Sequence, residues 1–143
     1  MTTHEETTPV LVGAGQISAR EPDTERTPIG LVAEAARAAA ADCGVAGVLG
    51  QIQSLTCLNI LAPSYSDAPS TLARHLGIDP GERFYTPIGG NMGQWLVGYY
   101  ADRIAAGGLD CILIAGGEAL ATQMPGKGAG LSGVLDTATG EGP

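Results

Sequence analysis

The chain has 143 residues, 44% of them apolar, and a formal net charge of −8 from 7 Lys and Arg against 15 Asp and Glu. This length and apolar content suit one domain with a hydrophobic core, while the acidic balance disfavours a phosphate backbone as a partner. No apolar run approaches the roughly 20 residues that span a bilayer, so we expect neither a nucleic-acid nor a membrane partner.

Short apolar segments and helical patterns alternate along the first third of the chain. Residues 9–14 form an apolar, β-branched run that ends in glycine and alanine, which predicts a buried first strand. The alanine-rich segment Pro28–Cys43 has apolar residues at helical spacing. It follows Thr27, a capping residue, and precedes Gly44, a common helix stop, so it predicts the first helix.

The same alternation continues to residue 115. We predict strands at residues 53–59, 84–88 and 109–115, and helices at residues 70–75 and 93–106. The order βαβαβαβ is typical of an α/β fold with a mostly parallel sheet and helices on both faces. From residue 124 onward, six glycines and two prolines in twenty residues leave no apolar period, so we expect a loop there rather than a packed element.

A partial dinucleotide fingerprint follows the first predicted strand. Gly13 and Gly15 match the start of G-x-G-x-x-G, but Ser18 stands where the third glycine belongs. The fingerprint needs a helix that starts at the loop, and the polar stretch before Pro28 does not form one. A tight turn after a strand is the favoured interpretation.

Histidine and cysteine offer few candidates for catalysis. His75 lies late on a short predicted helix, where we expect it to face solvent or cap carbonyl groups. Cys43, Cys57 and Cys111 fall at apolar positions, which favours small buried hydrophobic side chains over reactive thiols. An odd number of cysteines at no metal-ligand spacing fits a reducing compartment, so we expect a cytoplasmic protein without a bound metal.

The glycine-rich stretch at residues 89–93, Gly-Gly-Asn-Met-Gly, stands directly before the predicted helix 93–106. A helix N-terminus offers unpaired amides and the positive end of the dipole, so it can hold an anion or polarise a carbonyl. Alternatively, these glycines serve only to pack the helix closely against the sheet. No hydroxyl or thiol occurs from residue 87 to 98, so nothing in this stretch can act as a nucleophile.

Several of these segments together resemble the N-terminal half of a thiolase. They are residues 9–17, residues 28–43, the Gly-Gly-Asn-Met-Gly stretch and residues 103–118, the last of which looks like the fourth strand of that half with its glycine-glycine-glutamate signature. The resemblance extends from residue 9 to about residue 122. It implies that residues 1–123 form an incomplete thiolase-like N-terminal half, and that residues 124–143 are the glycine-rich start of a loop domain within which the chain ends.

The resemblance also implies a site. Thiolases carry a nucleophilic cysteine at the start of the third helix, and the matching position here holds Gly90 or Asn91, depending on where a one-residue difference is placed. Gly89, Gly90, Asn91, Met92 and Gly93 are therefore the expected substrate-binding residues. The family's other catalytic groups lie in its second half, so the catalytic residues of this chain stay unassigned.

The implied function is that of an acyl-CoA protein in lipid metabolism, of the divergent, lipid-transfer-related type, with an acetyl-CoA acetyltransferase as the nearest activity. The coenzyme A thioester would be the substrate, with no further cofactor. Two alternatives stay open: an aldolase on a β-hydroxyacyl-CoA that works with a small partner subunit, and a non-catalytic acyl-CoA-binding subunit. The expected protein partners are the remaining half of the fold or a partner subunit, and a second copy in a homodimer or higher oligomer paired through residues 84–88.

Overall fold

The computed structural model describes residues 7–19, 21, 23, 25–61 and 64–120. Within these ranges the elements follow one another as α1 (Pro28–Cys43), the 3-10 helix η1 (Val48–Gln51), β1 (Ser54–Cys57), α2 (Ala68–Leu76), β2 (Glu82–Tyr85), α3 (Met92–Ala105) and β3 (Ile112–Ala115). The predicted loop-domain segment, residues 124–143, lies outside the described residues.

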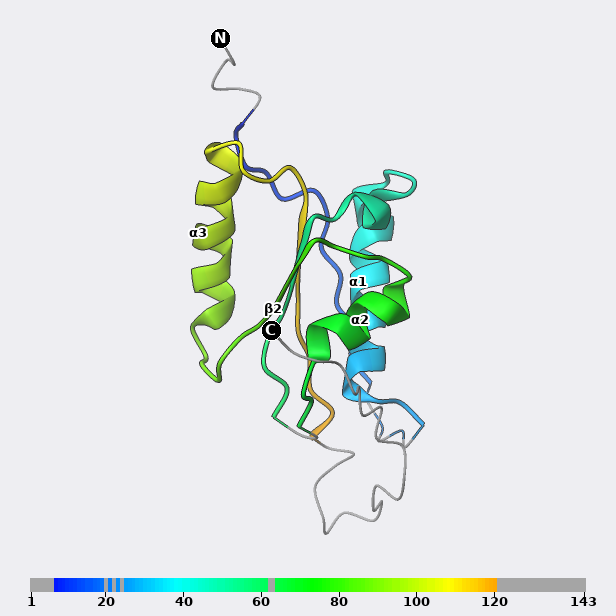
Figure 1. Cartoon of the computed structure of the whole chain (residues 1–143). Helices are drawn as coiled ribbons and strands as arrows, with labels where there is room; N and C mark the ends of the chain where they lie inside the picture. The colour runs from blue at the N-terminus through cyan, green and yellow to red at the C-terminus, as the bar shows by residue number, and fades with distance from the viewer. Residues whose placement is uncertain (1–6, 20, 22, 24, 62–63, 121–143) are drawn as a thin grey trace.

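The sheet is parallel throughout its described strands. Its order is β2-β1-β3, and Ser54 at the start of β1 lies opposite Glu82 on one side and Ile112 on the other. Helices α1 and α2 pack on one face of this sheet, and α3 covers the other (Figure 1). The predicted α/β architecture with helices on both faces is therefore confirmed.

The prediction of a first strand at residues 9–14 is wrong. Residues 8–19 form no strand, and Val10, Leu11 and Val12 are 70%, 86% and 57% exposed. This segment instead passes close to the backbone of α1: a Cβ atom added at Gly13 would lie 2.3 Å from the carbonyl oxygen of Ala39. Apolar, β-branched residues satisfy the local requirement for a strand, but a strand also needs a sheet edge to pair with, and this segment pairs with none. The tight turn predicted after it is also not observed.

The helix ends follow their capping residues. Thr27 caps α1 by accepting a hydrogen bond from the Gly30 amide, at 3.1 Å, and Gly44 ends the helix with a left-handed φ of 72°. Helix α2 begins two residues before its predicted start because Asp67 accepts a hydrogen bond from the Ser70 amide, at 3.0 Å. Capping side chains thus decide where these two helices begin.

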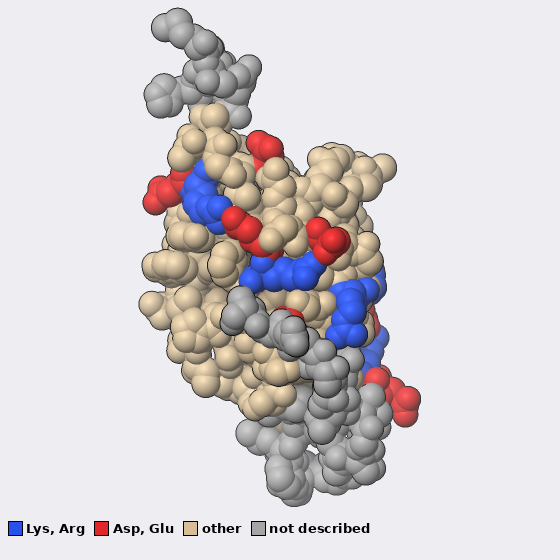
Figure 2. Space-filling view, viewed as in Figure 1, with Lys and Arg blue, Asp and Glu red and all other residues tan. Residues whose placement is uncertain are grey.

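Charged side chains on the face seen in Figure 2 form a mixed band of both signs. Ion pairs join Arg83 to Asp79 and Arg103 to Glu82. In the same view, the surface near the start of α3, at the lower left, carries no charged side chain. On this face, acidic and basic side chains therefore lie side by side rather than in separate patches.

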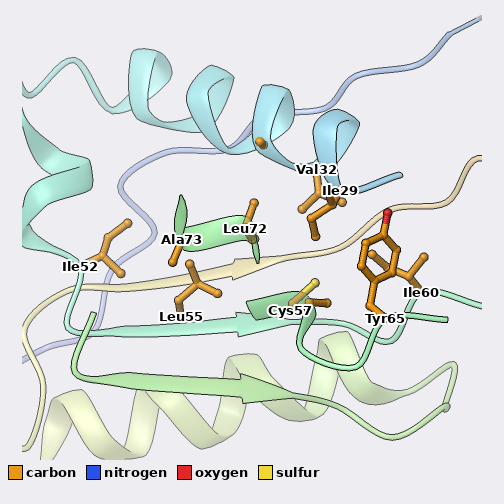
Figure 3. Close-up of a cluster of buried hydrophobic side chains, with 11 residues drawn as sticks. Ile29, Val32, Ile52, Leu55, Cys57, Ile60, Tyr65, Leu72 and Ala73 are labelled. Carbon is orange, nitrogen blue, oxygen red and sulfur yellow. The ribbon is translucent and has the colours of Figure 1, made fainter. Parts of the chain in front are cut away.

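The main core lies between the sheet and helices α1 and α2 (Figure 3). Leu55 and Cys57 point from β1 toward Ile29 of α1 and Leu72 of α2, and all four side chains are fully buried. The alternate β1 residues point to the opposite face, as the two-residue period of a strand requires. A second, smaller cluster there is formed by Leu96, Tyr100 and Leu109.

Candidate functional site

The loops after β1, β2 and β3 meet at the carboxyl edge of the sheet, where α/β proteins usually bind ligands. The β2–α3 loop is fixed at its start by Thr86, which is only 6% exposed. The Thr86 amide donates to the Cys57 carbonyl at 3.1 Å, and its hydroxyl accepts from the Asn59 amide at 3.0 Å. The glycine-rich stretch therefore leaves the sheet from an ordered position.

Leu58 connects this stretch to the loop after β3. A Cβ atom added at Gly116 would lie 2.8 Å from Leu58 Cβ, and one added at Gly93 would lie 3.9 Å from Leu58 Cδ2. Leu58 thus fills the space between the start of α3 and the end of β3. At Gly116, only glycine allows this approach.

Helix α3 begins without a side-chain cap. Its N-cap residue is Asn91, which has φ −92° and ψ −3° and makes no side-chain capping hydrogen bond. Helices α1 and α2, by contrast, have Thr27 and Asp67 in this role. The Met92 amide donates to the Gly89 carbonyl at 3.1 Å, which closes the turn that leads into the helix. No capping side chain therefore competes with a ligand for the first amides of α3.

The glycines of this stretch differ in their surroundings. A Cβ atom added at Gly90 would meet nothing within 4 Å, whereas one added at Gly89 would lie 3.2 Å from Asn91 Oδ1. Gly90 is exposed and its φ is not in the left-handed region. Neither local crowding nor backbone conformation thus requires glycine at position 90. Packing of the helix against the sheet therefore does not account for Gly90, and at Gly93 an added Cβ would make only an ordinary contact with Leu58.

The start of α3 is less buried than its apolar composition predicts. Leu96 and Tyr100 are its buried residues, while Trp95 and Val97 are 54% and 58% exposed. Trp95 stacks on Tyr99, with ring centroids 5.0 Å apart. The outer side of α3 therefore carries exposed apolar side chains.

Two polar groups border the carboxyl edge near β1. Tyr85 accepts a hydrogen bond from the Ile60 amide at 3.0 Å, and Glu118 accepts one from the Leu61 amide at 2.6 Å. Burial raises the pKa of the Tyr85 phenol, and the carboxylate of Glu118 contributes in the same direction. Tyr85 is therefore a neutral hydrogen-bonding group at physiological pH.

A cavity of about 370 Å³ lies beside this edge, between α1, the segment after Gly15 and the loop after β3. Its lining includes Gln16, Glu21, Val32 and Glu118, but none of residues 89–93. Sequence reasoning did not find it, because its walls come from three segments far apart in the chain. It is thus separate from the predicted site.

The cysteine and histidine candidates lie on separate elements of the fold. Cys57 is fully buried, and burial raises the pKa of its thiol to about 12. Cys43 and Cys111 are half-buried rather than buried, and burial also raises the pKa of the Cys111 thiol. His75 is exposed on α2, as predicted. Among the described residues, no group of three His, Cys, Asp or Glu side chains could hold a metal ion.

A comparison with solved structures finds a related fold. A monomeric SCP2-thiolase-like protein type 1 from Mycobacterium smegmatis matches 78% of this chain with 34% sequence identity and a TM-score of 0.68. The chain spans 23% of the length of that protein. No protein-family model and no curated protein matches the chain, and no helix in its described part is long and apolar enough to cross a membrane. Over the matched part, this chain has the thiolase-like fold that its sequence predicts.

Proposed function

We propose that this chain is part of an acyl-CoA-binding protein in which backbone amides at the start of α3 hold the thioester carbonyl. The observation that carries the proposal is the beginning of α3: it lies at the carboxyl edge of the sheet, lacks a side-chain cap, and follows Gly90, whose Cα faces open space. A carbonyl oxygen approaching there would meet amide donors and the positive end of the helix dipole.

The residues at this position limit the chemistry. Gly90 and Asn91 have no group that can accept an acyl chain, so ping-pong acyl transfer through either is not available. Amides that hold a carbonyl also stabilise an enolate or a tetrahedral oxyanion, and one such donor typically contributes roughly 3–4 kcal/mol to a catalytic step. An aldolase-type reaction on a β-hydroxyacyl-CoA therefore fits this loop better than an acetyl-CoA acetyltransferase reaction that depends on a cysteine here.

The test is a calorimetric titration of acetyl-CoA and of a β-hydroxyacyl-CoA into the purified full chain, followed by intact mass measurement. We expect binding without an acyl adduct in the wild type, and an adduct on the introduced thiol in the Gly90→Cys variant. Absence of binding for both thioesters would overturn the proposal. A stoichiometric adduct on a native cysteine would place the acyl-transfer site elsewhere.

A homodimer paired through residues 84–88 is a further part of the proposal. Strand β2 is an edge of the described sheet; Phe84 on this strand is 43% exposed, and Ile88 in the loop after it is 74% exposed. An exposed strand edge with apolar side chains favours pairing with a second copy. The similar protein from Mycobacterium smegmatis is monomeric, which makes the oligomeric state worth testing. A single monomer species in sedimentation velocity at high concentration would overturn the proposed homodimer.

A further inference from the structure

Helix α3 carries the proposed site but is held on the sheet by few apolar side chains. Leu96 and Tyr100 are its buried residues, and they form a cluster with Leu109, against which the partly buried Leu58, Ile104, Ile112 and Ile114 pack. Apolar burial is non-directional, so a cluster of this size does not by itself fix where the helix lies along the strands. Polar contacts supply the missing constraint.

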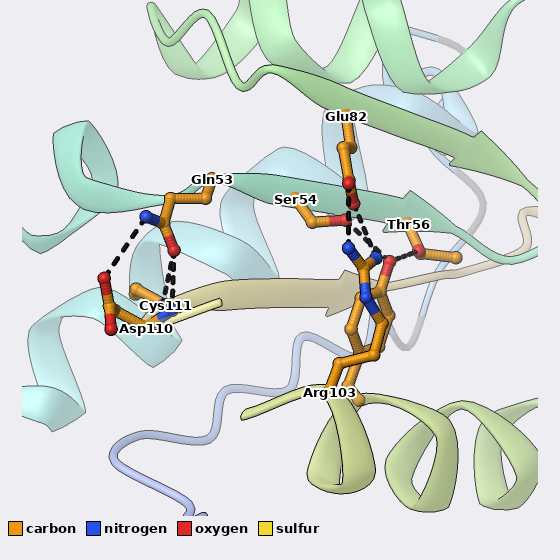
Figure 4. Close-up of polar contacts among 8 residues, drawn as sticks. Gln53, Ser54, Thr56, Glu82, Arg103, Asp110 and Cys111 are labelled. Carbon is orange, nitrogen blue, oxygen red and sulfur yellow. Dashed lines mark hydrogen bonds and ion pairs between the residues drawn. The ribbon is translucent and has the colours of Figure 1, made fainter. Parts of the chain in front are cut away.

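The first of these contacts is made by Tyr100. Its hydroxyl lies 2.8 Å from Ser54 Oγ and 2.5 Å from Thr56 Oγ1, and all three residues are at most 1% exposed (Figure 4). Ser54 and Thr56 are two positions apart on β1, so both point toward α3. One phenol thus hydrogen-bonds two hydroxyls along the strand, and a slide of α3 by one turn, about 5.4 Å, would break both bonds.

The second contact is made by Arg103, one turn further along α3. Its Nη1 donates to Glu82 Oε2 at 2.7 Å and its Nη2 to Glu82 Oε1 at 2.9 Å, which is a bidentate pair. Glu82 on β2 lies opposite Ser54 on β1. Arg103 also lowers the pKa of the Glu82 carboxyl through these hydrogen bonds. The helix is therefore held to two neighbouring strands at the same level of the sheet.

We propose that Tyr100 and Arg103 are positioning residues that set the place of the first turn of α3, and with it the geometry of the acyl-CoA site. We call Ser54, Thr56, Tyr100, Glu82 and Arg103 the α3 clamp. The inference rests on the proposed function for its ligand. The first turn lies five to eight residues before Tyr100, roughly 7–12 Å along a rigid helix, so a shift at the clamp moves the amides of that turn.

The experiment separates the two roles of Tyr100 by restoring the stability of the fold without restoring the hydrogen bonds that position α3. Tyr100→Phe removes the phenol hydroxyl that pairs with the buried hydroxyls of Ser54 and Thr56, which destabilises the fold. Adding Ser54→Ala and Thr56→Val removes those two hydroxyls, so the triple variant should regain most of the wild-type thermal midpoint. We expect acetyl-CoA affinity to fall roughly tenfold or more in Tyr100→Phe, because small displacements in a binding site have large effects.

The triple variant gives the decisive result. If Tyr100 positions the site, affinity stays low although the thermal midpoint recovers; if its role is only structural, affinity recovers with stability, which would overturn the inference. Thr71→Val is the matched control, because Thr71 is 1% exposed and its hydroxyl donates to the Asp67 carbonyl at 2.9 Å in α2. It should lower the midpoint and leave affinity unchanged.

A ligand-independent readout keeps this inference distinct from the proposed function. Trp95 is the only tryptophan of the chain and lies in the first turn of α3, so its emission reports on that turn. Tyr100→Phe should shift this emission and speed amide hydrogen exchange about tenfold or more at residues 95–98, whose amides donate to the carbonyls at the start of α3, with α1 and α2 unchanged. If the wild type does not bind acyl-CoA, the proposed function fails and these readouts still decide whether the clamp positions the turn.

Arg103→Lys is the second test variant, to be used if Tyr100→Phe does not fold. It keeps the charge but loses the bidentate geometry with Glu82, and Arg103 is partly exposed, with 26% of its side chain accessible. We expect the same faster exchange at residues 95–98 of α3. Exchange that changes equally in α1, α2 and α3 would show a purely structural role and overturn the inference.

Discussion

Adding a methyl group at Gly90 should affect folding and binding in opposite directions. The added Cβ would meet nothing within 4 Å, and the backbone there is not left-handed. Gly90→Ala therefore fits the native conformation and restricts the unfolded chain, which should raise the free energy of unfolding by about 0.4–1 kcal/mol. If a thioester lies against this backbone, the same methyl group occupies its space. We expect the affinity for acetyl-CoA to fall about tenfold, or roughly 1.4 kcal/mol, and to fall further in Gly90→Val.

Gly98→Ala is the matched control. Gly98 also has open space around its Cα, but it lies in the middle of α3, away from the helix start. Alanine is favoured over glycine in a helix interior by roughly 1 kcal/mol, so this variant should be more stable with unchanged affinity. Urea unfolding followed by Trp95 fluorescence gives the stability, and calorimetry gives the affinity.

Two results would refute the reasoning. If Gly90→Val binds acetyl-CoA as tightly as the wild type, the ligand does not approach the backbone at this position. If Gly90→Ala loses stability while Gly98→Ala gains it, the surroundings of Gly90 are more crowded than the structure indicates. In that case the binding loss could not be assigned to the ligand.

Three further predictions concern the same region and the thiols. Asn91→Ala should reduce turnover more than substrate affinity, because the side-chain amide would hold developing negative charge. Steady-state kinetics of the full chain measures this, and equal losses in turnover and in affinity would contradict it. Cys57 should resist iodoacetamide at pH 8 in the folded chain, because burial raises its pKa to about 12 and its side chain is fully buried; its alkylation before unfolding, seen by peptide mass mapping, would show an open core. Arg103 lowers the pKa of Glu82 in the folded state, so this pair should stabilise the fold above the unfolded-state pKa of Glu82 and lose that contribution as the pH falls through the lower folded-state value. Urea unfolding between pH 3 and pH 7 should accordingly show a weaker loss toward acid in Glu82→Gln, and an unchanged pH profile would contradict the assignment.

Local signals in the sequence predict most of the helices. The bounds of α1, Pro28–Cys43, agree with the prediction because Thr27 and Gly44 mark both ends. The strands are shorter than predicted, four residues each, since pairing is limited to the length shared by neighbours. The strand predicted at residues 84–88 is also misplaced, because β2 covers Glu82–Tyr85 and residues 86–88 lie outside it. The strand predicted at residues 9–14 fails because pairing with a sheet edge is a non-local property that residue pattern does not contain.

The location of the candidate site was also partly predictable. The Gly-Gly-Asn-Met-Gly stretch stands between a strand and a helix in the sequence, and the structure places it at the carboxyl edge of the sheet. The polar contacts of α3 were missed, although a signal exists in β1. Ser54 and Thr56 alternate with Leu55 and Cys57 in a fully buried strand, and buried hydroxyls need partners. Which residue supplies the partner, Tyr100, depends on how α3 crosses the sheet.

The way α3 is attached suits a site built from backbone amides. A side chain can adjust its rotamer to reach a ligand, but an amide at a helix start moves only with the helix. Such a site therefore needs the helix to be placed accurately along the strands. Hydrogen bonds and a bidentate ion pair depend on direction and distance, whereas burial of apolar area does not. Tyr100 and Arg103 thus give α3 the positional constraint that its small apolar cluster with Leu109 lacks.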